Sequence, residues 1–268
     1  MTILCVIISI FLVTAIFSVA DMMIRTQSDR MTGKNGSWHI ELDGISQETA
    51  LKIAERDDVV SIGAVTIFNP DGELPYRMDG KRVVLYGIDE SYLTMNSTGA
   101  AEGRFPQGMG EIMLSSNAAR VLQVAVGDTV TLRTPSGDWD FTVSGLGGVE
   151  ESYYSGQYSL MDAYLPRTAF AALMEQNNVH NLQTSYYVQF TSASKAAKAI
   201  PELTAQHNLP ENAVSENTGV MAIAGQSDSS AAKNVYSLAA VLFVLVLLAG
   251  VLTVSYTHLR AHETLRHL

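Results

Sequence analysis

The residues with the strongest potential for chemistry lie at the C-terminal end of the chain. His258, His262, Glu263 and His267 are potential metal ligands, and His258 and His262 would share one face of a helix at their i, i+4 spacing. The surrounding string SYTHLRAHETLRH, however, resembles a translated sequencing adapter, and such a segment carries no information about fold or function. We therefore interpret residues 255–268 as an artefactual tail. A basic cytoplasmic flank and a genuine metal site are the alternatives.

No second pattern in the chain indicates catalysis. The pair Gly33-Lys34 occurs in a P-loop, but Ser28 stands where that motif needs its first glycine, and Asn35 stands where it needs Ser or Thr. No G-x-S-x-G motif of a hydrolase is present. We expect that the chain is not an enzyme, does not hydrolyse ATP itself and needs no cofactor.

The other histidines, His39, His180 and His207, have no Cys, Asp or Glu at ligand spacing, so we expect no metal site. Glu150-Glu151 and Tyr153-Tyr154 form a polar, aromatic stretch that is typical of a solvated loop, with a partner or substrate contact as the alternative.

Composition excludes further classes. The chain is 47% hydrophobic yet has a formal net charge of -10, because apolar residues gather at both ends and acidic residues between them. An acidic middle argues against nucleic acid and against docking flat on anionic lipid. The single cysteine, Cys5, lies in the first apolar run, so the middle must be stabilised by an ordinary core without a disulfide.

The two apolar ends predict two membrane-spanning helices, at residues 1–24 and 234–254. Ser237–Val254 contains no charged residue and is long enough as a helix to cross a bilayer. Met1–Ala20 lacks the basic start and short core of a signal peptide, so we expect an uncleaved helix and a natural start further upstream. The acidic loop between the helices, residues 25–233, is expected to be extracytoplasmic.

The two ends of this loop, residues 36–78 and 183–218, each predict a β-α-β unit. The first has strands at Trp38–Asp43 and Val59–Phe68, with Ser46 as the helix N-cap. The second has a strand at Ser185–Phe190, a helix ending near His207 and a short last strand at 213–215. Two such units can pair into one ferredoxin-like α+β layer, which would bring both flanking segments together.

The region between them, residues 79–182, predicts an inserted, mostly β subdomain. Its expected strands and helices alternate with Gly- and Pro-containing turns. The strands are Lys81–Asp89, Glu111–Leu114, Thr129–Arg133, Trp139–Val143 and Met161–Pro166, and the helices are Asn117–Leu122 and Thr168–Glu175.

Within this subdomain the chain resembles the MacB-like extracytoplasmic core domain of FtsX-like ABC transporter permeases. The matching segments are EGRFP at Glu102–Pro106, then EIMLSSNAARVL, VGDTVTL and DFTVSGL in the same order. The resemblance implies that a set of motif residues is structural, and it transfers no catalytic residue. These residues are Gly103, Arg104, Phe105, Gly127 and Asp128.

The resemblance also implies partners and a mechanism. Such permeases have four membrane helices, form dimers in the lipid and bind a separate cytoplasmic ABC ATPase, whose closure moves the outer domains for export or for activation of partner proteins. This chain would be the N-terminal half of such a permease in the cell membrane. The alternative is an extracytoplasmic sensor domain of a signalling receptor, and the natural sequence past Val254 would separate the two.

Overall fold

The computed structural model describes residues 29–33, 35–96, 100–147, 160–210 and 212–227, together with isolated helical positions at 7–26 and 237–256. The chain divides into one unit of Met31–Met221 and another of Met1–Arg30 with Ala222–Leu268. No helix in the part that the structure describes has the length and apolar character needed to cross a bilayer. Most of residues 1–24 and 234–254, nearly all of 255–268 and the stretch 150–154 lie outside the described residues, so the interpretations given above for them stay predictions.

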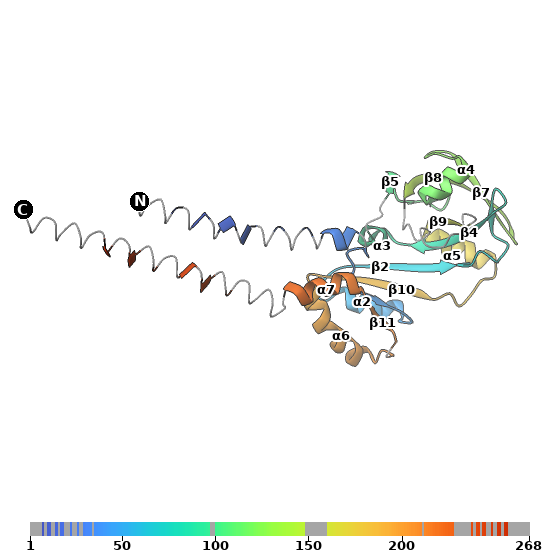
Figure 1. Cartoon of the computed structure of the whole chain (residues 1–268). Helices are drawn as coiled ribbons and strands as arrows, with labels where there is room; N and C mark the ends of the chain where they lie inside the picture. The colour runs from blue at the N-terminus through green and yellow to red at the C-terminus, as the bar shows by residue number, and fades with distance from the viewer. Residues whose placement is uncertain are drawn as a thin grey trace, which may run out of the picture. The chain divides into compact units, whose positions relative to one another are not determined.

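An antiparallel four-stranded layer contains both ends of the unit Met31–Met221. Its strand order is β11-β1-β10-β2. The strands are β1 (Ile40–Leu42), β2 (Val59–Phe68), β10 (Thr184–Phe190) and β11 (Val214–Glu216), and the helices between them are α2 (Gln47–Ala54) and α6 (Ala193–His207). Because α2 links β1 to β2 and α6 links β10 to β11, this is the predicted ferredoxin-like arrangement (Figure 1).

The core of the layer follows from the alternation of its strands. In β1, Ile40 and Leu42 are fully buried and pack with α2 and α6, whereas Glu41 between them faces the other side. Both helices therefore cover one face of the sheet. Their N-caps are serines, since Ser46 accepts a hydrogen bond from the Thr49 amide at 3.1 Å and Ser192 accepts one from the Lys195 amide at 3.2 Å.

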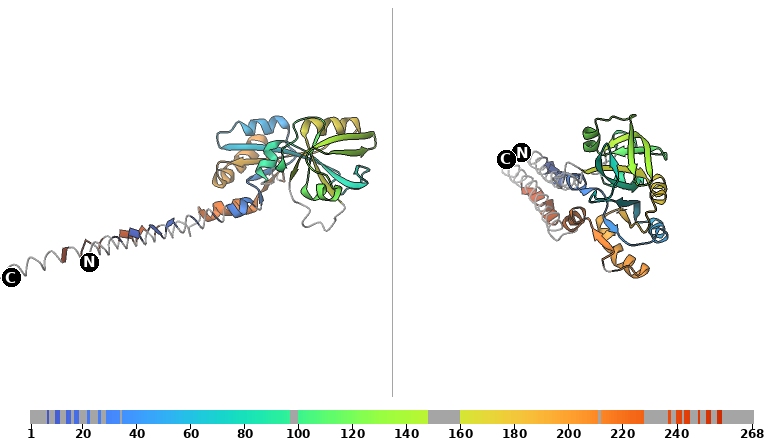
Figure 2. Two further views of the ribbon diagram at one scale, coloured as in Figure 1. Left: turned by 90° about the horizontal axis from the view of Figure 1, so that it is seen from above. Right: turned by 90° about the vertical axis from the view of Figure 1, so that its right-hand side faces the viewer.

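The β-rich region closes into a barrel, which the sequence did not predict. The strands follow the order β4-β3-β7-β8-β6-β9, and β9 pairs in parallel with β4 to complete the ring. They are β3 (Arg77–Met78), β4 (Lys81–Ile88), β6 (Glu111–Leu114), β7 (Thr129–Thr134), β8 (Gly137–Gly147) and β9 (Leu160–Pro166). Figure 2 shows this group, teal through green to yellow, beside the blue and orange layer. Closure leaves these strands no free edge, although β5 (Ala100–Gly103) adds to β8 outside the ring.

Two helices complete the barrel core. Residues of α4 (Ser116–Leu122) and α5 (Arg167–Gln176) pack with the inward-facing side chains of the strands. Gly87 of β4 leaves room for this packing, because a Cβ there would lie 2.4 Å from Cγ of Phe170. The close packing of α5 on β4 therefore requires glycine at position 87.

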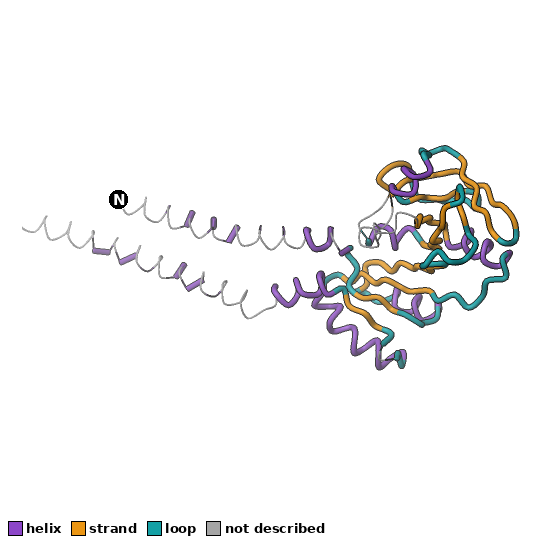
Figure 3. Tube along the Cα trace, turned by 45° about the vertical axis from the view of Figure 1, so that its right-hand side comes forward, coloured by secondary structure: helices purple, strands orange, loops and turns teal. Residues whose placement is uncertain are grey.

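Strand β4 belongs to both parts of the domain. It pairs with β2 of the layer over Val65–Phe68 and with β3 and β9 of the barrel, so the hydrogen-bonded strands are continuous. The chain then forms α3 (Glu90–Met95), which packs against β2 on the face opposite α2 and α6. Figure 3 shows the strands in orange with the helices in purple around them.

Several element boundaries differ from those that the sequence predicts. The first strand covers only Ile40–Leu42 rather than Trp38–Asp43, and the eighth covers Gly137–Gly147 rather than Trp139–Val143. Four elements were not predicted: α3, β3, β5 and α7 (Thr218–Ser227). The first three have six residues or fewer, too few for a hydrophobic period to emerge from the local sequence.

Candidate coupling site

The entering and leaving segments of the domain meet at one place, which we call the junction: residues 35–39 and 217–221. Residue 35 is helical, and Gly36 follows with a φ of +80°, a conformation in which glycine commonly ends a helix. The carbonyl of Asn35 is thus among those at a helix C-terminus that have no partner within the helix.

Asn217 bridges the two segments of the junction. Its Nδ2 donates to the carbonyl oxygens of Asn35 at 3.0 Å and Trp38 at 2.9 Å. Its Oδ1 accepts from the Val220 amide at 3.3 Å, the position of an N-cap for α7. The backbone amide of Asn217 also donates to the His39 carbonyl at 2.9 Å.

One buried side chain therefore caps two helix ends at once. Asn217 is only 4% exposed, and its amide has donors and acceptor all engaged, which also fixes which atom is nitrogen and which is oxygen. An uncompensated loss of such buried bonds is costly, because the freed carbonyl oxygens would remain away from water. The arrangement binds residues 35–38 to the first turn of α7.

His39 and Trp38 fix the junction to the layer. His39 is 7% exposed, and its Nδ1 accepts from the Phe190 amide at 3.1 Å, which requires that nitrogen to be unprotonated. Burial lowers the pKa of His39 from 6.5, so the neutral ring is favoured. Trp38 packs edge-on against Tyr187, with ring centroids 4.9 Å apart, and the Tyr187 hydroxyl donates to Glu41 at 2.8 Å.

The motif residues implied by the family resemblance lie elsewhere, at one end of the barrel. Gly103 has a φ of +73°, and a Cβ there would lie 2.4 Å from the Ser144 carbonyl oxygen. The next residue, Arg104, donates its backbone amide to that oxygen at 2.9 Å. Phe105 packs at the margin of the buried cluster that contains α3.

Arg104 and Glu111 brace the loop between β5 and β6. The two terminal guanidinium nitrogens of Arg104 donate to the Glu111 carboxylate, Nη1 to Oε2 at 2.9 Å and Nη2 to Oε1. The same carboxylate accepts from the amides of Gln107 at 2.8 Å and Gly108 at 3.2 Å. These bonds, that of Arg104 foremost, lower the pKa of Glu111 to about 2, so the carboxylate remains ionised.

Gly127 and Asp128 brace the adjacent turn. Gly127 has a φ of +97° and donates to the Val143 carbonyl at 2.8 Å, while the Asp128 carboxylate accepts from the Ala125 amide at 2.8 Å. The Asp128 carbonyl in turn accepts from the Val143 amide at 2.8 Å. The two motif loops thus flank consecutive residues of β8, and Val126 packs 3.1 Å from where a Cβ of Gly103 would be.

All five motif residues therefore have geometric roles in this structure, and none sits at the junction. Whether they form the common motif of a family stays a prediction. Sequence reasoning missed Asn217, although an Asn preceding an apolar run, Gly219–Ala224, is a helix N-cap signal. It also missed Gly36, whose positive φ is not evident from the sequence around it.

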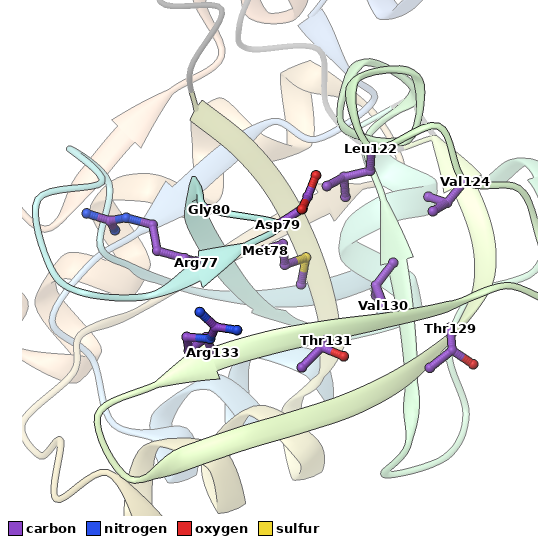
Figure 4. Close-up of a pocket in the computed structure, with 10 residues that line it drawn as sticks. All are labelled: Arg77, Met78, Asp79, Gly80, Leu122, Val124, Thr129, Val130, Thr131 and Arg133. Atoms are coloured by element: carbon purple, nitrogen blue, oxygen red, sulfur yellow. The ribbon is translucent and has the colours of Figure 1, made fainter.

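A surface pocket of about 370 Å³ lies on the barrel beside β3 and β7 (Figure 4). Two cations line it, but both are engaged. Arg77 donates to the Leu74 carbonyl at 2.6 Å and the Tyr76 carbonyl at 2.8 Å, and Arg133 pairs with Asp138 at 3.6 Å. Across the described residues no group of three His, Cys, Asp or Glu could hold a metal ion, and the tail histidines lie outside them. The pocket therefore carries no chemistry comparable with the organisation at the junction.

Comparison with known proteins places the chain in a family. The model of the MacB-like periplasmic core domain matches residues 1–206. Among solved structures, the chain is similar to the periplasmic region of MacB from Actinobacillus actinomycetemcomitans, with a TM-score of 0.51 and 15% identity over 75% of this chain and 96% of that chain. A domain assigned to a permease protein of Porphyromonas gingivalis gives a TM-score of 0.43 and 16% identity over 68% of this chain and 87% of that one. The curated proteins gave no match.

The chain belongs to the family of the MacB-like periplasmic core domain. It is accordingly a MacB-like periplasmic domain of an ABC transporter permease family, membrane-associated and extracytoplasmic, and the resemblance seen in the sequence is confirmed. The structural likeness to the MacB region supports the fold alone, since its identity is low.

Proposed function

We propose that this chain forms part of an ABC transporter permease in which the junction passes motion from flanking membrane helices to the extracytoplasmic domain. Residues 1–24 and 234–254 are the two helices in this proposal. A separate cytoplasmic ATPase supplies the energy, and the permease works as a dimer in the lipid without catalysing a reaction itself. Export of a substrate or activation of a partner protein is the outcome.

The observation that carries this proposal is the double cap formed by Asn217. A domain that receives motion from two flanking segments needs both to be fixed rigidly to it, since a flexible connection would dissipate the displacement. Asn217 joins residues 35–39 to the first turn of α7 through four hydrogen bonds of 2.9 to 3.3 Å. The predicted charge-free stretch Ser237–Val254 follows α7 in the chain.

Asn217→Asp tests the coupling selectively. An aspartate keeps the N-cap oxygen for α7 but replaces the two N–H donors by an oxygen facing the carbonyls of Asn35 and Trp38. We expect a loss of about 1–3 kcal/mol in the free energy of unfolding, because buried carbonyl groups lose their partners. In the permease assembled with its ATPase, the exchange of domain amides should differ between the ATP- and ADP-bound states, and this difference should largely disappear in the variant.

Asn177→Asp is the matched control. Asn177 also donates through Nδ2 to a carbonyl, that of Leu173 at 2.9 Å, and accepts from the Ser136 amide at 3.2 Å, but it lies at the end of α5. This variant should retain the nucleotide-dependent difference. A wild-type domain whose exchange is the same in both nucleotide states would contradict the proposal. A domain that responds to an extracytoplasmic ligand with no ATPase bound would favour the sensor alternative.

A further inference from the structure

Helix α3 is attached at both ends. At its start, the Asp89 carboxylate accepts from the Tyr92 amide through Oδ1 and from the Ala64 amide of β2 through Oδ2, each at 2.9 Å. At its end, the Met95 carbonyl accepts from the Ser37 amide at 2.5 Å and from the Ser37 hydroxyl at 3.3 Å. The helix thus spans from β2 to the entering segment of the junction.

The contacts of α3 with β2 and with the entering segment are close. A Cβ on Gly63 of β2 would lie 2.4 Å from the Tyr92 amide nitrogen and 2.6 Å from Cε of Met95. A Cβ on Gly36 would lie 2.7 Å from the Met95 carbonyl oxygen. The side chains of Tyr92, Leu93 and Met95 are at most 4% exposed. Close-packed contacts of this kind transmit displacement, because a densely packed interior leaves little space to absorb it.

The path continues into the barrel. Helix α3 directly follows β4, the strand shared by the layer and the barrel. The buried cluster around α3 includes Val84, Tyr86 and Ile88 of β4 and reaches Tyr164 of β9 and Met113 of β6, and the rings of Tyr86 and Tyr164 are stacked at 4.9 Å. The bonds of Asn217, in contrast, join the leaving segment to residues 35–39.

We infer that α3 is a strut by which the entering segment acts on the barrel, so that displacement of residues 35–38 changes the stability of α3 and β4. The inference rests on the proposed function for its physiological meaning, but the contact itself can be tested without nucleotide or ATPase. The two flanking segments therefore have different roles. The entering segment acts on the barrel through α3, and the leaving segment acts on it through its bonds to the entering segment.

The test is amide hydrogen exchange on the full chain in lipid nanodiscs. Gly36→Ala drives a methyl group against the Met95 carbonyl and the Trp38 ring, whose nearest atoms would lie 2.7 and 2.8 Å from the new Cβ. By this inference it accelerates exchange of the amides of 83–95 at least about tenfold. Gly80→Ala is its control, since Gly80 also has a positive φ of +70° but a Cβ there meets nothing within 4 Å. That control should leave 90–95 unchanged.

A second pair of variants tests the same path from beneath the helix. Gly63→Ala wedges α3 away from β2, whereas a Cβ at Gly110 meets nothing within 4 Å. With Gly63→Ala present, adding Gly36→Ala should produce little further acceleration in β4, because the strut is already disconnected. The inference is overturned if Gly36→Ala changes exchange only at 35–42 and 214–221, or if the two substitutions act additively on β4.

Discussion

We expect one buried ring, that of His39, to make the junction sensitive to pH. Its Nδ1 must be unprotonated to accept the Phe190 amide, and burial removes the water that would solvate a cation. The carbonyl of His39 also accepts a hydrogen bond from the Asn217 amide. His39 thus bonds to β10 through its side chain and to the leaving segment of the junction through its backbone. Protonation would therefore weaken the contact between β1 and β10 next to the double cap.

The direction of this pH dependence follows from the lowered pKa. The unfolded chain binds a proton at His39 below about pH 6.5, whereas the folded chain binds it only at lower pH. The free energy of unfolding should therefore decrease by up to about 1.4 kcal/mol per pH unit as the pH falls from about 6.5 towards the pKa of His39 in the folded state. Urea unfolding of the wild type between about pH 7 and about pH 5 measures this slope.

His39→Asn is the informative variant, because the amide oxygen can take the place of Nδ1 as an acceptor without titrating. It should flatten the slope in this pH range while leaving the domain folded. His207→Asn, at the last residue of α6, is the matched control and should leave the slope unchanged. An equal slope in the wild type and in His39→Asn would show that another group controls the dependence.

At the scale of elements, the close approach of the β5–β6 loop to β8 depends on glycine on both sides. Gly103 needs its positive φ and cannot accept a side chain beside Ser144, and Gly145 faces the Arg104 carbonyl in the same way. The loop is also braced by the bonds of Glu111 to the amides of Gln107 and Gly108. The segment around Gly103 therefore encodes a close backbone contact with β8.

Gly145→Ala tests this contact without straining the backbone, since the φ of Gly145 is not positive. Its Cβ would lie 2.4 Å from the Arg104 carbonyl oxygen, so the loop must move. We expect a loss of about 1–3 kcal/mol in the free energy of unfolding, measured by urea or thermal denaturation. In Gly108→Ala the nearest atoms would be 3.8 Å away, so that variant should remain close to wild type. Similar losses in both would indicate a general effect of replacing glycine.

At the scale of the whole molecule, the unit Met31–Met221 has its own buried clusters and joins layer and barrel through shared strands. Residues 31–221 contain no cysteine, so packing and hydrogen bonds stabilise this unit without a disulfide. Since both chain ends of this unit meet at Asn217, the position of a truncation should decide its stability.

A fragment of residues 31–221 should fold as a monomer without metal. A shorter fragment, 35–215, lacks Asn217 and the first turn of α7, and it should have a lower free energy of unfolding by about 1–3 kcal/mol, because the carbonyls of Asn35 and Trp38 lose the Asn217 amide as their donor. Thermal unfolding of the two fragments with and without a chelator measures both effects. Equal free energies of unfolding for the two fragments would show that Asn217 does not stabilise the junction. A loss of structure with the chelator would reveal a bound metal ion.

The sequence by itself determined most of the secondary structure, the pairing of the two terminal β-α units and the family. Alternation in Val59–Phe68, the serine cap of α2 and the ordered segments from Glu102 onwards are local patterns, and local patterns can be recognised in a linear sequence. The five motif residues came from the family resemblance rather than from any local pattern of their own.

Only the tertiary structure decided the rest. Closure of the barrel depends on β9 pairing with β4, the joining of the chain ends depends on Asn217 reaching carbonyls some 180 residues earlier, and the seat of α3 depends on Gly63 having no side chain. These are contacts between residues far apart in the chain. The histidine-rich tail has the most conspicuous chemical pattern in the sequence. The junction instead depends on the side-chain amide of Asn217, because the fold alone brings its hydrogen-bond partners together.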